Sequence, residues 1–385
     1  MICGHFGSCG GCTYDIPYGD ELRLKEEVVL HLFDEAGINT GDYLGALPAP
    51  SVLEYRNKME FAFGDSGKDS GLCLGVRKRR SFYEVADART CMLVDSDFRK
   101  IAALCADYFR DAGEKFFHRR AHTGALRHLI IRKGFFTGEI LVNIVTAPSL
   151  SAPLRPLAEE MARLELDGVL AGALHTVNSS VADAIVCDRL DVLLGNSFFH
   201  DRLLGLNFKI SAFSFFQTNS AAAELLYETA AQFADCRGGV VFDLYCGTGT
   251  ISQIVAGRAN RVIGIESVPE AVDSARENAA ANGVANCSFI AADVLKAISD
   301  IDERPDIIIL DPPRSGVAPK ALAKIAAARP GKIVYVSCKP SSLVRDLQAL
   351  TAHGYSVEAT KLIDLFPRTA HIESVCLLVC SSNSR

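Results

Sequence analysis

The chain has 385 residues, of which 49% are hydrophobic and 22% are charged, with a formal net charge of −6 and a pI near 5.9. This composition is that of a globular protein with room for two or three domains, and the chain has no run of eighteen apolar residues that could span a membrane. The N-terminus lacks the charged and apolar segments of a signal peptide, so we expect a cytoplasmic protein, and we expect it to be a monomer.

Three cysteines, Cys3, Cys9 and Cys12, lie within the first twelve residues and are interleaved with glycines. Thiolates spaced C-x5-C-x2-C on such a loop can wrap one metal centre and leave one coordination position open. We expect Cys91 to be the fourth ligand, because it follows a strand-like segment and a polar turn. Cys73 is the alternative, but its alternating apolar setting is typical of a strand interior. We favour an iron–sulfur cluster over zinc, since structural zinc sites usually show two C-x2-C pairs.

The pattern after these cysteines predicts an amphipathic helix over 18–36 and a connector over 38–54. A mixed α/β segment follows, and the basic run 77–80 within it indicates a face for RNA phosphates. Because the chain is acidic overall, we expect neither DNA binding nor non-specific nucleic-acid binding. Strands are predicted at 58–63, 72–76, 129–132 and 140–145, and helices at 98–112 and 154–166. We therefore divide the chain into a metal-binding arm with its helix (1–50), a central RNA-binding α/β domain (51–204) and a C-terminal domain (205–385).

The segment 213–219 (FSFFQTN) precedes a predicted helix over 220–234, which Asn219 can cap. Four aromatic or amide side chains in seven residues fit either a core strand or a lid over a ligand. In the second interpretation Gln217 presents its amide to the bound molecule.

The C-terminal domain opens with VVFDLYCGTGT, an apolar strand that ends in Asp243 and leads through Tyr245, Gly247 and Gly249 into a helix near Thr250. Strand, glycine turn and helix open a nucleotide-binding α/β unit, and the glycines let the backbone approach a ligand closely. The full dinucleotide fingerprint is absent. An acid at the strand end instead suits a cationic ligand, such as S-adenosylmethionine.

Each later strand of this domain also ends in a polar residue. Glu266 is placed to accept hydrogen bonds from ribose hydroxyls, and Asp293 from an adenine amino group. Asp311 ends the strand before DPPRSG. Cys338 ends the next strand, close to Lys339 and a helix N-terminus, which can lower a thiol pKa and make it a nucleophile. Because parallel strands place their carboxyl ends at one sheet edge, these residues should meet in one site.

Taken together, the motifs C3-x5-C9-x2-C12 with Cys91, FFQTN, DLYCGTGT, IGIE, DPPRSG, YVSCKP and LFPRTAHIE resemble the RNA 5-methyluridine methyltransferases over nearly the whole chain. The resemblance is to the iron–sulfur branch that methylates 23S ribosomal RNA, in a short form without the N-terminal RNA-binding barrel. It implies an α/β fold with a C-terminal Rossmann-like class I methyltransferase domain and a seven-stranded sheet. It also implies a central α+β part that carries a [4Fe–4S] cluster. Lys339 departs from the asparagine that is usual in the family.

The resemblance further implies that the thiolate of Cys338 adds to C6 of uracil, that C5 takes the methyl group of S-adenosylmethionine, and that Glu373 removes the C5 proton. Asp311 and Gln217 would hold the uracil edge and the cofactor, and the target base would be flipped from a 23S ribosomal RNA stem-loop.

Two other functions fit parts of the sequence. A non-catalytic RNA-binding assembly factor should have lost the nucleophile or the base, yet Cys338 and Glu373 are both present. An enzyme that methylates amino groups fits the Asp-Pro-Pro motif, but Arg314 stands where it would have an aromatic residue. A tRNA uracil-C5 methyltransferase is the nearest alternative substrate class.

Overall fold

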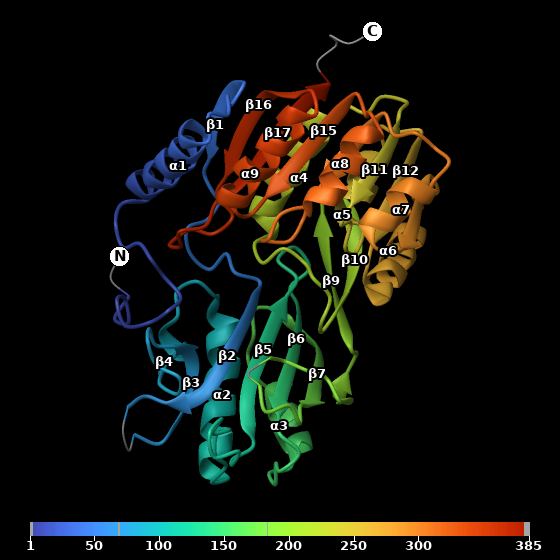
Figure 1. Cartoon of the computed structure of the whole chain (residues 1–385). Helices are drawn as coiled ribbons and strands as arrows, with labels where there is room; N and C mark the ends of the chain where they lie inside the picture. Colours follow the sequence, from blue (N-terminus) through green and yellow to red (C-terminus); the bar gives the residue numbers. More distant parts are fainter. Residues whose placement is uncertain (1–2, 68–69, 183, 381–385) are drawn as a thin grey trace.

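The computed structural model describes residues 3–67, 70–182 and 184–380, which form two lobes with a two-stranded ribbon between them (Figure 1). The ribbon is the antiparallel pair β9 (Phe198–Leu203) and β10 (Leu206–Ser211). Within the described ranges, no helix is both long enough and apolar enough to cross a membrane.

The C-terminal lobe is built on an eight-stranded sheet in the order β1-β16-β17-β15-β14-β11-β12-β13. All pairings among strands β11 to β15 are parallel. Strand β17 runs antiparallel to β15 and β16. This is the expected Rossmann-like α/β arrangement. Its strands are β1 (Asp42–Leu47), β11 (Val240–Leu244), β12 (Arg261–Glu266), β13 (Cys287–Ala291), β14 (Ile307–Leu310), β15 (Lys332–Ser337), β16 (Tyr355–Ile363) and β17 (Glu373–Cys380).

Helices cover both faces of this sheet, which explains why its inner strands are apolar throughout. Alternate side chains of β14 point to opposite faces: Ile309 packs with helices α4 and α5, whereas Ile308 packs with α1, α7, α8 and α9. The helices of this lobe are α1 (Tyr18–Glu35), α4 (Ser220–Ala234), α5 (Thr250–Ala256), α6 (Pro269–Ala281), α7 (Val294–Asp300), α8 (Pro319–Ala327) and α9 (Pro340–Ala352).

Two details of the prediction for this lobe were wrong. The connector expected at 38–54 contains strand β1, which pairs in parallel with β16, so the sheet has eight strands rather than seven. The segment DYLGAL has a glycine and weak strand character, and it becomes a strand because it completes the sheet edge at residues 359–363. This pairing is made more than 300 positions away in the chain, and so no local pattern predicts it.

The central lobe is a seven-stranded sheet in the order β4-β3-β2-β5-β6-β7-β8, with helices α2 and α3 packed in its core. The predicted strands and helices are present, although the helix expected at 154–166 ends at Met161. The elements are β2 (Lys58–Asp65), β3 (Leu72–Arg77), β4 (Val85–Asp87), the 3₁₀ helix η1 (Ala88–Thr90), α2 (Ser96–Asp111), β5 (Leu126–Lys133), β6 (Glu139–Thr146), α3 (Leu154–Met161), β7 (Val169–Val177) and β8 (Arg189–Gly195).

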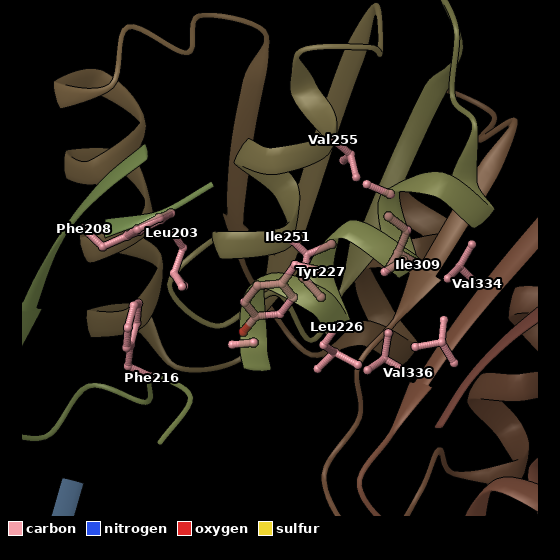
Figure 2. Close-up of a cluster of buried hydrophobic side chains, with 14 of the residues drawn as sticks. Leu203, Phe208, Phe216, Leu226, Tyr227, Ile251, Val255, Ile309, Val334 and Val336 are labelled. Carbon is pink, nitrogen blue, oxygen red and sulfur yellow. The ribbon is translucent and has the colours of Figure 1, made fainter. Parts of the chain in front are cut away.

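One buried cluster joins the ribbon to the C-terminal lobe (Figure 2). Leu203 and Phe208 of the ribbon pack with Phe216, with Tyr227 of helix α4 and with Ile251 of α5, and the cluster continues to the sheet. The lobes are therefore connected by apolar packing as well as by the chain.

Candidate functional site

The ends of strands β15 and β17 bring together the two residues that the sequence singled out for chemistry. Ser337, the last residue of β15, pairs in antiparallel register with Ser374 of β17. Cys338 directly follows Ser337 and Glu373 directly precedes Ser374, so these two residues lie opposite each other. Asp311 directly follows β14, the neighbour of β15 on its other side. A thiol and two carboxyl groups thus meet at one edge of the sheet.

Burial and mutual repulsion dominate the electrostatics of this group. Desolvation, followed by the negative charge of Asp311, raises the pKa of Glu373 to about 8, although Arg314 acts in the opposite direction. Desolvation raises the pKa of Asp311 to about 7, with a further contribution from Asp243. The pKa of the Cys338 thiol is also raised by desolvation and by both neighbouring carboxylates, whereas Arg314 lowers it through its charge and a hydrogen bond. The site can therefore exchange protons close to neutral pH.

Tyr227 is a member of this site that the sequence analysis did not identify. It lies on α4 and is only 4% exposed, and its hydroxyl is in hydrogen-bond contact with the side chain of Gln217. Burial, then the charges of Asp311 and Glu373, raise its pKa well above the ordinary value. Its place in an alanine-rich helix predicts a core residue. Figure 2 shows the ring among buried hydrophobic side chains, and the hydroxyl is the feature of the sequence that signals another role.

Gln217 lies in a loop that buried polar contacts hold in place. The Asn57 side chain donates to the Gln217 carbonyl at 2.9 Å. The buried Arg132 guanidinium donates to the carbonyls of Ser211 and Ser214, each at 2.8 Å. Asn219 caps α4 as predicted, because its side chain accepts from the Ala222 amide at 3.2 Å. The loop is thus rigidly supported from the central lobe.

The glycine loop after β11 presents open backbone beside an acid. Gly247 adopts a φ of +54°, and a Cβ there would meet open space. Gly249 has a φ of +74°, and a Cβ there would come within 2.7 Å of the Phe289 ring, so only glycine fits without a shift. Tyr245 also has a positive φ, +67°. Thr250 follows as the first residue of α5 and is buried.

Asp243 is the clearest mark of a ligand site in this loop. It is fully buried, and its Oδ2 accepts from the Ser252 hydroxyl at 2.5 Å. Its Oδ1 is buried and has no hydrogen-bond partner among the residues that the structure describes. Desolvation raises its pKa to about 7 despite the Ser252 hydrogen bond. A buried carboxylate without a cation fits a positively charged ligand such as S-adenosylmethionine, whose binding would supply the missing partner.

Glu266 and Asp293 lie at the ends of the next two strands, as expected. One oxygen of Glu266 accepts from the Gly247 amide at 3.2 Å, and the other accepts from the Val268 amide at 2.9 Å. The carboxylate is thus fixed beside the glycine loop. Asp293 occupies the N-cap position before α7 and is exposed, and its side chain makes no capping hydrogen bond.

The four predicted metal ligands, Cys3, Cys9, Cys12 and Cys91, line one cavity between the N-terminal segment and the central lobe. Desolvation and the charges of the other three raise the pKa of Cys12 to about 12. Cys73 does not line this cavity and lies in β3, as its alternating pattern predicted. No three His, Cys, Asp or Glu side chains in the described ranges form a group arranged to hold a single metal ion. Four thiols that line one cavity are the donor set that an iron–sulfur cluster would require.

The basic run 77–80 is largely engaged within the protein. Arg77 donates to the Phe82 carbonyl, Lys78 pairs with Glu84 at 3.0 Å, and Arg79 donates to the carbonyls of Cys9 and Cys12. These contacts give the run a structural role beside the cysteines, in addition to the phosphate contact that its charge suggested.

The sequence model of the tRNA (uracil-5-)-methyltransferase family matches residues 185–381. An uncharacterised RNA methyltransferase of Caldanaerobacter subterraneus subsp. tengcongensis is 47% identical, over 98% of this chain and 84% of its own length. Another from Clostridium acetobutylicum is 46% identical, over 98% and 83%. Among solved structures, the Pyrococcus abyssi tRNA (uracil-54, C5)-methyltransferase in complex with S-adenosyl-L-homocysteine is similar, with a TM-score of 0.78 and 26% identity. The match covers 97% of this chain and 86% of that one.

Proposed function

Because the chain belongs to the tRNA (uracil-5-)-methyltransferase family, we propose that it methylates C5 of a uridine in RNA through a covalent bond between Cys338 and C6. One observation carries the mechanism: Cys338 and Glu373 face each other across the ends of two paired strands, with Asp311 beside them. A non-catalytic RNA-binding protein would have no need to keep a thiol and two buried carboxyl groups together at the cost of their desolvation.

Uracil C5 is too weak a nucleophile to take a methyl group unaided. Addition of the Cys338 thiolate to C6 breaks the C5–C6 double bond and moves its electrons into an enolate, so that C5 becomes nucleophilic. S-adenosylmethionine would supply the methyl group as the electrophile: the bond from C5 to the methyl carbon forms as the methyl–sulfur bond breaks, and S-adenosylhomocysteine is the leaving group. Glu373 then takes the C5 proton, the double bond re-forms, and the thiolate leaves C6. Arg314 favours the thiolate, and Asp311 and Gln217 hold the uracil edge and the cofactor.

The acidity of Glu373 suits this task. A general base works best when its pKa lies near the operating pH, and burial brings the pKa of Glu373 to about 8. Since its protonated form predominates in the free protein at neutral pH, the rate of proton removal should rise as the pH increases toward 8.

The cofactor should lie along the ends of β11, β12 and β13. The unpartnered oxygen of Asp243 supports contact with the cationic amino-acid part, and the fixed carboxylate of Glu266 supports contact with the ribose. Asp293 is free of capping contacts in the described part of the chain and is placed for the adenine. Tyr245, Gly247, Gly249 and Thr250 would form the rest of this cleft.

We propose 23S ribosomal RNA as the substrate and a [4Fe–4S] cluster at Cys3, Cys9, Cys12 and Cys91, which would hold the N-terminal segment rather than carry electrons. A tRNA is the second candidate, because the similar Pyrococcus abyssi protein acts on uracil-54 of tRNA. Mapping 5-methyluridine in both RNA classes from a strain without this protein distinguishes the two. The division at residues 50 and 204, the monomeric state and the cytoplasmic location are parts of the same proposal.

Two variants test the mechanism. Cys338→Ala should bind RNA and cofactor yet form no covalent adduct. Glu373→Gln should methylate once, retain the C5 proton and accumulate a covalent protein–RNA species. Denaturing electrophoresis with a radiolabelled methyl donor separates these outcomes. An adduct in Cys338→Ala would mean that another cysteine attacks, with Cys246 of the glycine loop the first to test. Normal turnover in Glu373→Gln would transfer the base role to Asp311 or to a water.

A further inference from the structure

The loop that leads to Glu373 is tied to the N-terminal cysteine segment. We call residues 364–372 the base loop and residues 3–17 the cysteine arm. The amides of Thr13 and Tyr14 donate to the Arg368 carbonyl at 2.6 and 3.2 Å. In return, the Arg368 guanidinium donates to the Ile16 carbonyl at 2.6 Å. The two segments are therefore joined by hydrogen bonds in both directions, from main-chain amides of the arm and from the Arg368 side chain of the loop.

A buried ion network fastens the first turns of α1 to the same loop. Lys25 lies 2.8 Å from Glu21 and 3.0 Å from each oxygen of Asp364, and it donates to the Phe366 carbonyl at 3.1 Å. Glu21 and Asp364 are 0% exposed and Lys25 is 2% exposed. Since removing one partner would leave a buried charge uncompensated, this network fixes the beginning of the base loop.

Arg368 is the residue in which these contacts meet. Its φ is +69°, a conformation that a side chain disfavours and that persists only where the surroundings impose it. Its amide donates to Glu21 at 2.6 Å, and its side chain lines the same cavity as Cys3, Cys9, Cys12 and Cys91. Contacts with the arm and with helix α1 thus help to set the shape of the base loop.

The C-terminal end of the base loop lies beside the proposed catalytic residues. The Thr369 hydroxyl donates to the Phe366 carbonyl at 2.8 Å and accepts from the His371 amide at 3.2 Å. The His371 ring lies 3.2 Å from the guanidinium of Arg314, the cation that acts on Cys338 and Glu373. A displacement at Arg368 would therefore be transmitted over five residues to Glu373.

We propose that the cysteine arm positions the catalytic base: occupation of the cysteine cavity orders the arm, and the arm holds Arg368 and the base loop so that Glu373 faces Cys338. The proposal rests on the proposed roles of Glu373 as base and of the four cysteines as ligands. Arg368 is a positioning residue, because it contacts the arm and not the reacting atoms. This gives the cysteine centre a role in catalysis without electron transfer.

Hydrogen exchange of the full-length protein, without RNA or methyl donor, tests the coupling. Removing metal with a chelator, or introducing Cys12→Ser, should speed amide exchange in peptides covering 364–372 by about tenfold, because local opening becomes easier. Strand β12 should be unaffected and serves as the internal reference. Cys73→Ser is the matched control, since this cysteine lies outside the cavity. Unchanged protection of 364–372 in Cys12→Ser and after chelation would overturn the proposal.

Arg368→Met tests the same connection from the loop side, since methionine keeps much of the length but donates no hydrogen bond. It should speed exchange in the base loop and accumulate covalent protein–RNA adduct, while affinity for S-adenosylhomocysteine stays unchanged. Glu21→Gln should act in the same direction and covers the case in which Arg368→Met fails to fold. Slow turnover without adduct in a folded variant would contradict a role in placing the base. If the wild-type protein forms no adduct with any RNA, the proposed function fails, whereas the exchange result still decides the coupling.

Discussion

Replacing Glu373 with glutamine should stabilise the folded protein at alkaline pH while it removes the proposed base. The carboxyl group is 2% exposed, and desolvation, together with Asp311, raises its pKa from 4.5 to about 8. A carboxyl group whose pKa is raised in the folded state is most stabilising when protonated. The stabilisation that protonated Glu373 gives to the folded state is complete below pH 4.5. It is lost progressively as the pH rises toward 8, because the glutamate loses its proton at a lower pH in the unfolded chain than in the folded protein.

The size of this effect follows from the two pKa values of Glu373. At about 1.4 kcal/mol per pKa unit, the difference between 4.5 and about 8 corresponds to roughly 5 kcal/mol. Asp311 titrates beside Glu373, so this energy belongs to the pair rather than to one residue. We therefore expect Glu373→Gln to be more stable than the wild type by about 2–3 kcal/mol at pH 8.5, and to differ little at pH 4.5.

Urea unfolding of the wild type and of Glu373→Gln at the two pH values measures the difference in their free energies of unfolding. Groups that titrate in the same way in both proteins contribute equally to both free energies and therefore do not affect the difference. Glu358→Gln is the control, because this glutamate is exposed on β16 and its replacement should leave stability unchanged at either pH. A stability difference between Glu373→Gln and wild type that is the same at pH 4.5 and 8.5 would refute the reasoning. It would mean that the carboxyl group is not held in a desolvated, proton-retaining environment.

Three further predictions concern the cofactor, the buried tyrosine and the metal. Glu266→Ala should weaken S-adenosylmethionine binding by about 1–3 kcal/mol in calorimetry, as for a lost charged hydrogen bond, whereas exposed Glu270→Ala should not; equal affinities would show that this sheet edge is misassigned. Tyr227→Phe should keep its stability but lower kcat/KM by about tenfold through the lost contact with Gln217, and unchanged kinetics would limit Tyr227 to packing. Anaerobically purified protein should contain about four irons per chain, fewer in Cys91→Ser but not in Cys73→Ser, and stoichiometric zinc without iron would overturn the cluster.

The sequence predicted which residues meet at the candidate site because its signals are local. Asp311 and Cys338 each end an apolar run, and parallel strands carry such ends to one edge whatever their order in the sheet. Features that depend on distant pairing could not be predicted in this way. Strand β1 has weak strand character and forms because it pairs with β16. Tyr227 has the sequence context of a core residue, and only the folded structure places its hydroxyl in hydrogen-bond contact with Gln217.

The basic run 77–80 illustrates a different limit. Charge alone predicted a surface for phosphates, but Arg79 turns toward the carbonyls of Cys9 and Cys12, and Lys78 pairs with Glu84. A composition-based argument counts cations and cannot tell which of them are already satisfied. Hydrogen-bond partners supplied by the folded chain decide that, and here they connect the run to the cysteine arm.

Buried acids form two groups, one at the beginning of the base loop and one just after its end, and their partners distinguish them. On the side of α1, Glu21 and Asp364 are matched by two cations, Lys25 and Arg368, within a closed set of contacts. Such a group is costly to break and gives the fold a fixed geometry.

On the side of the sheet edge, Glu373, Asp311 and Asp243 are buried with far less compensation. Arg314 is the cation that acts on Glu373, and desolvation leads the causes that raise the pKa of all three acids. Burying carboxyl groups with so little compensating charge does not stabilise the fold. We therefore interpret their burial as serving a ligand that pairs with them or a proton that is transferred to them. Among the residues that the structure describes, the smaller compensating charge, more than burial itself, distinguishes the candidate active site from the structural network beside it.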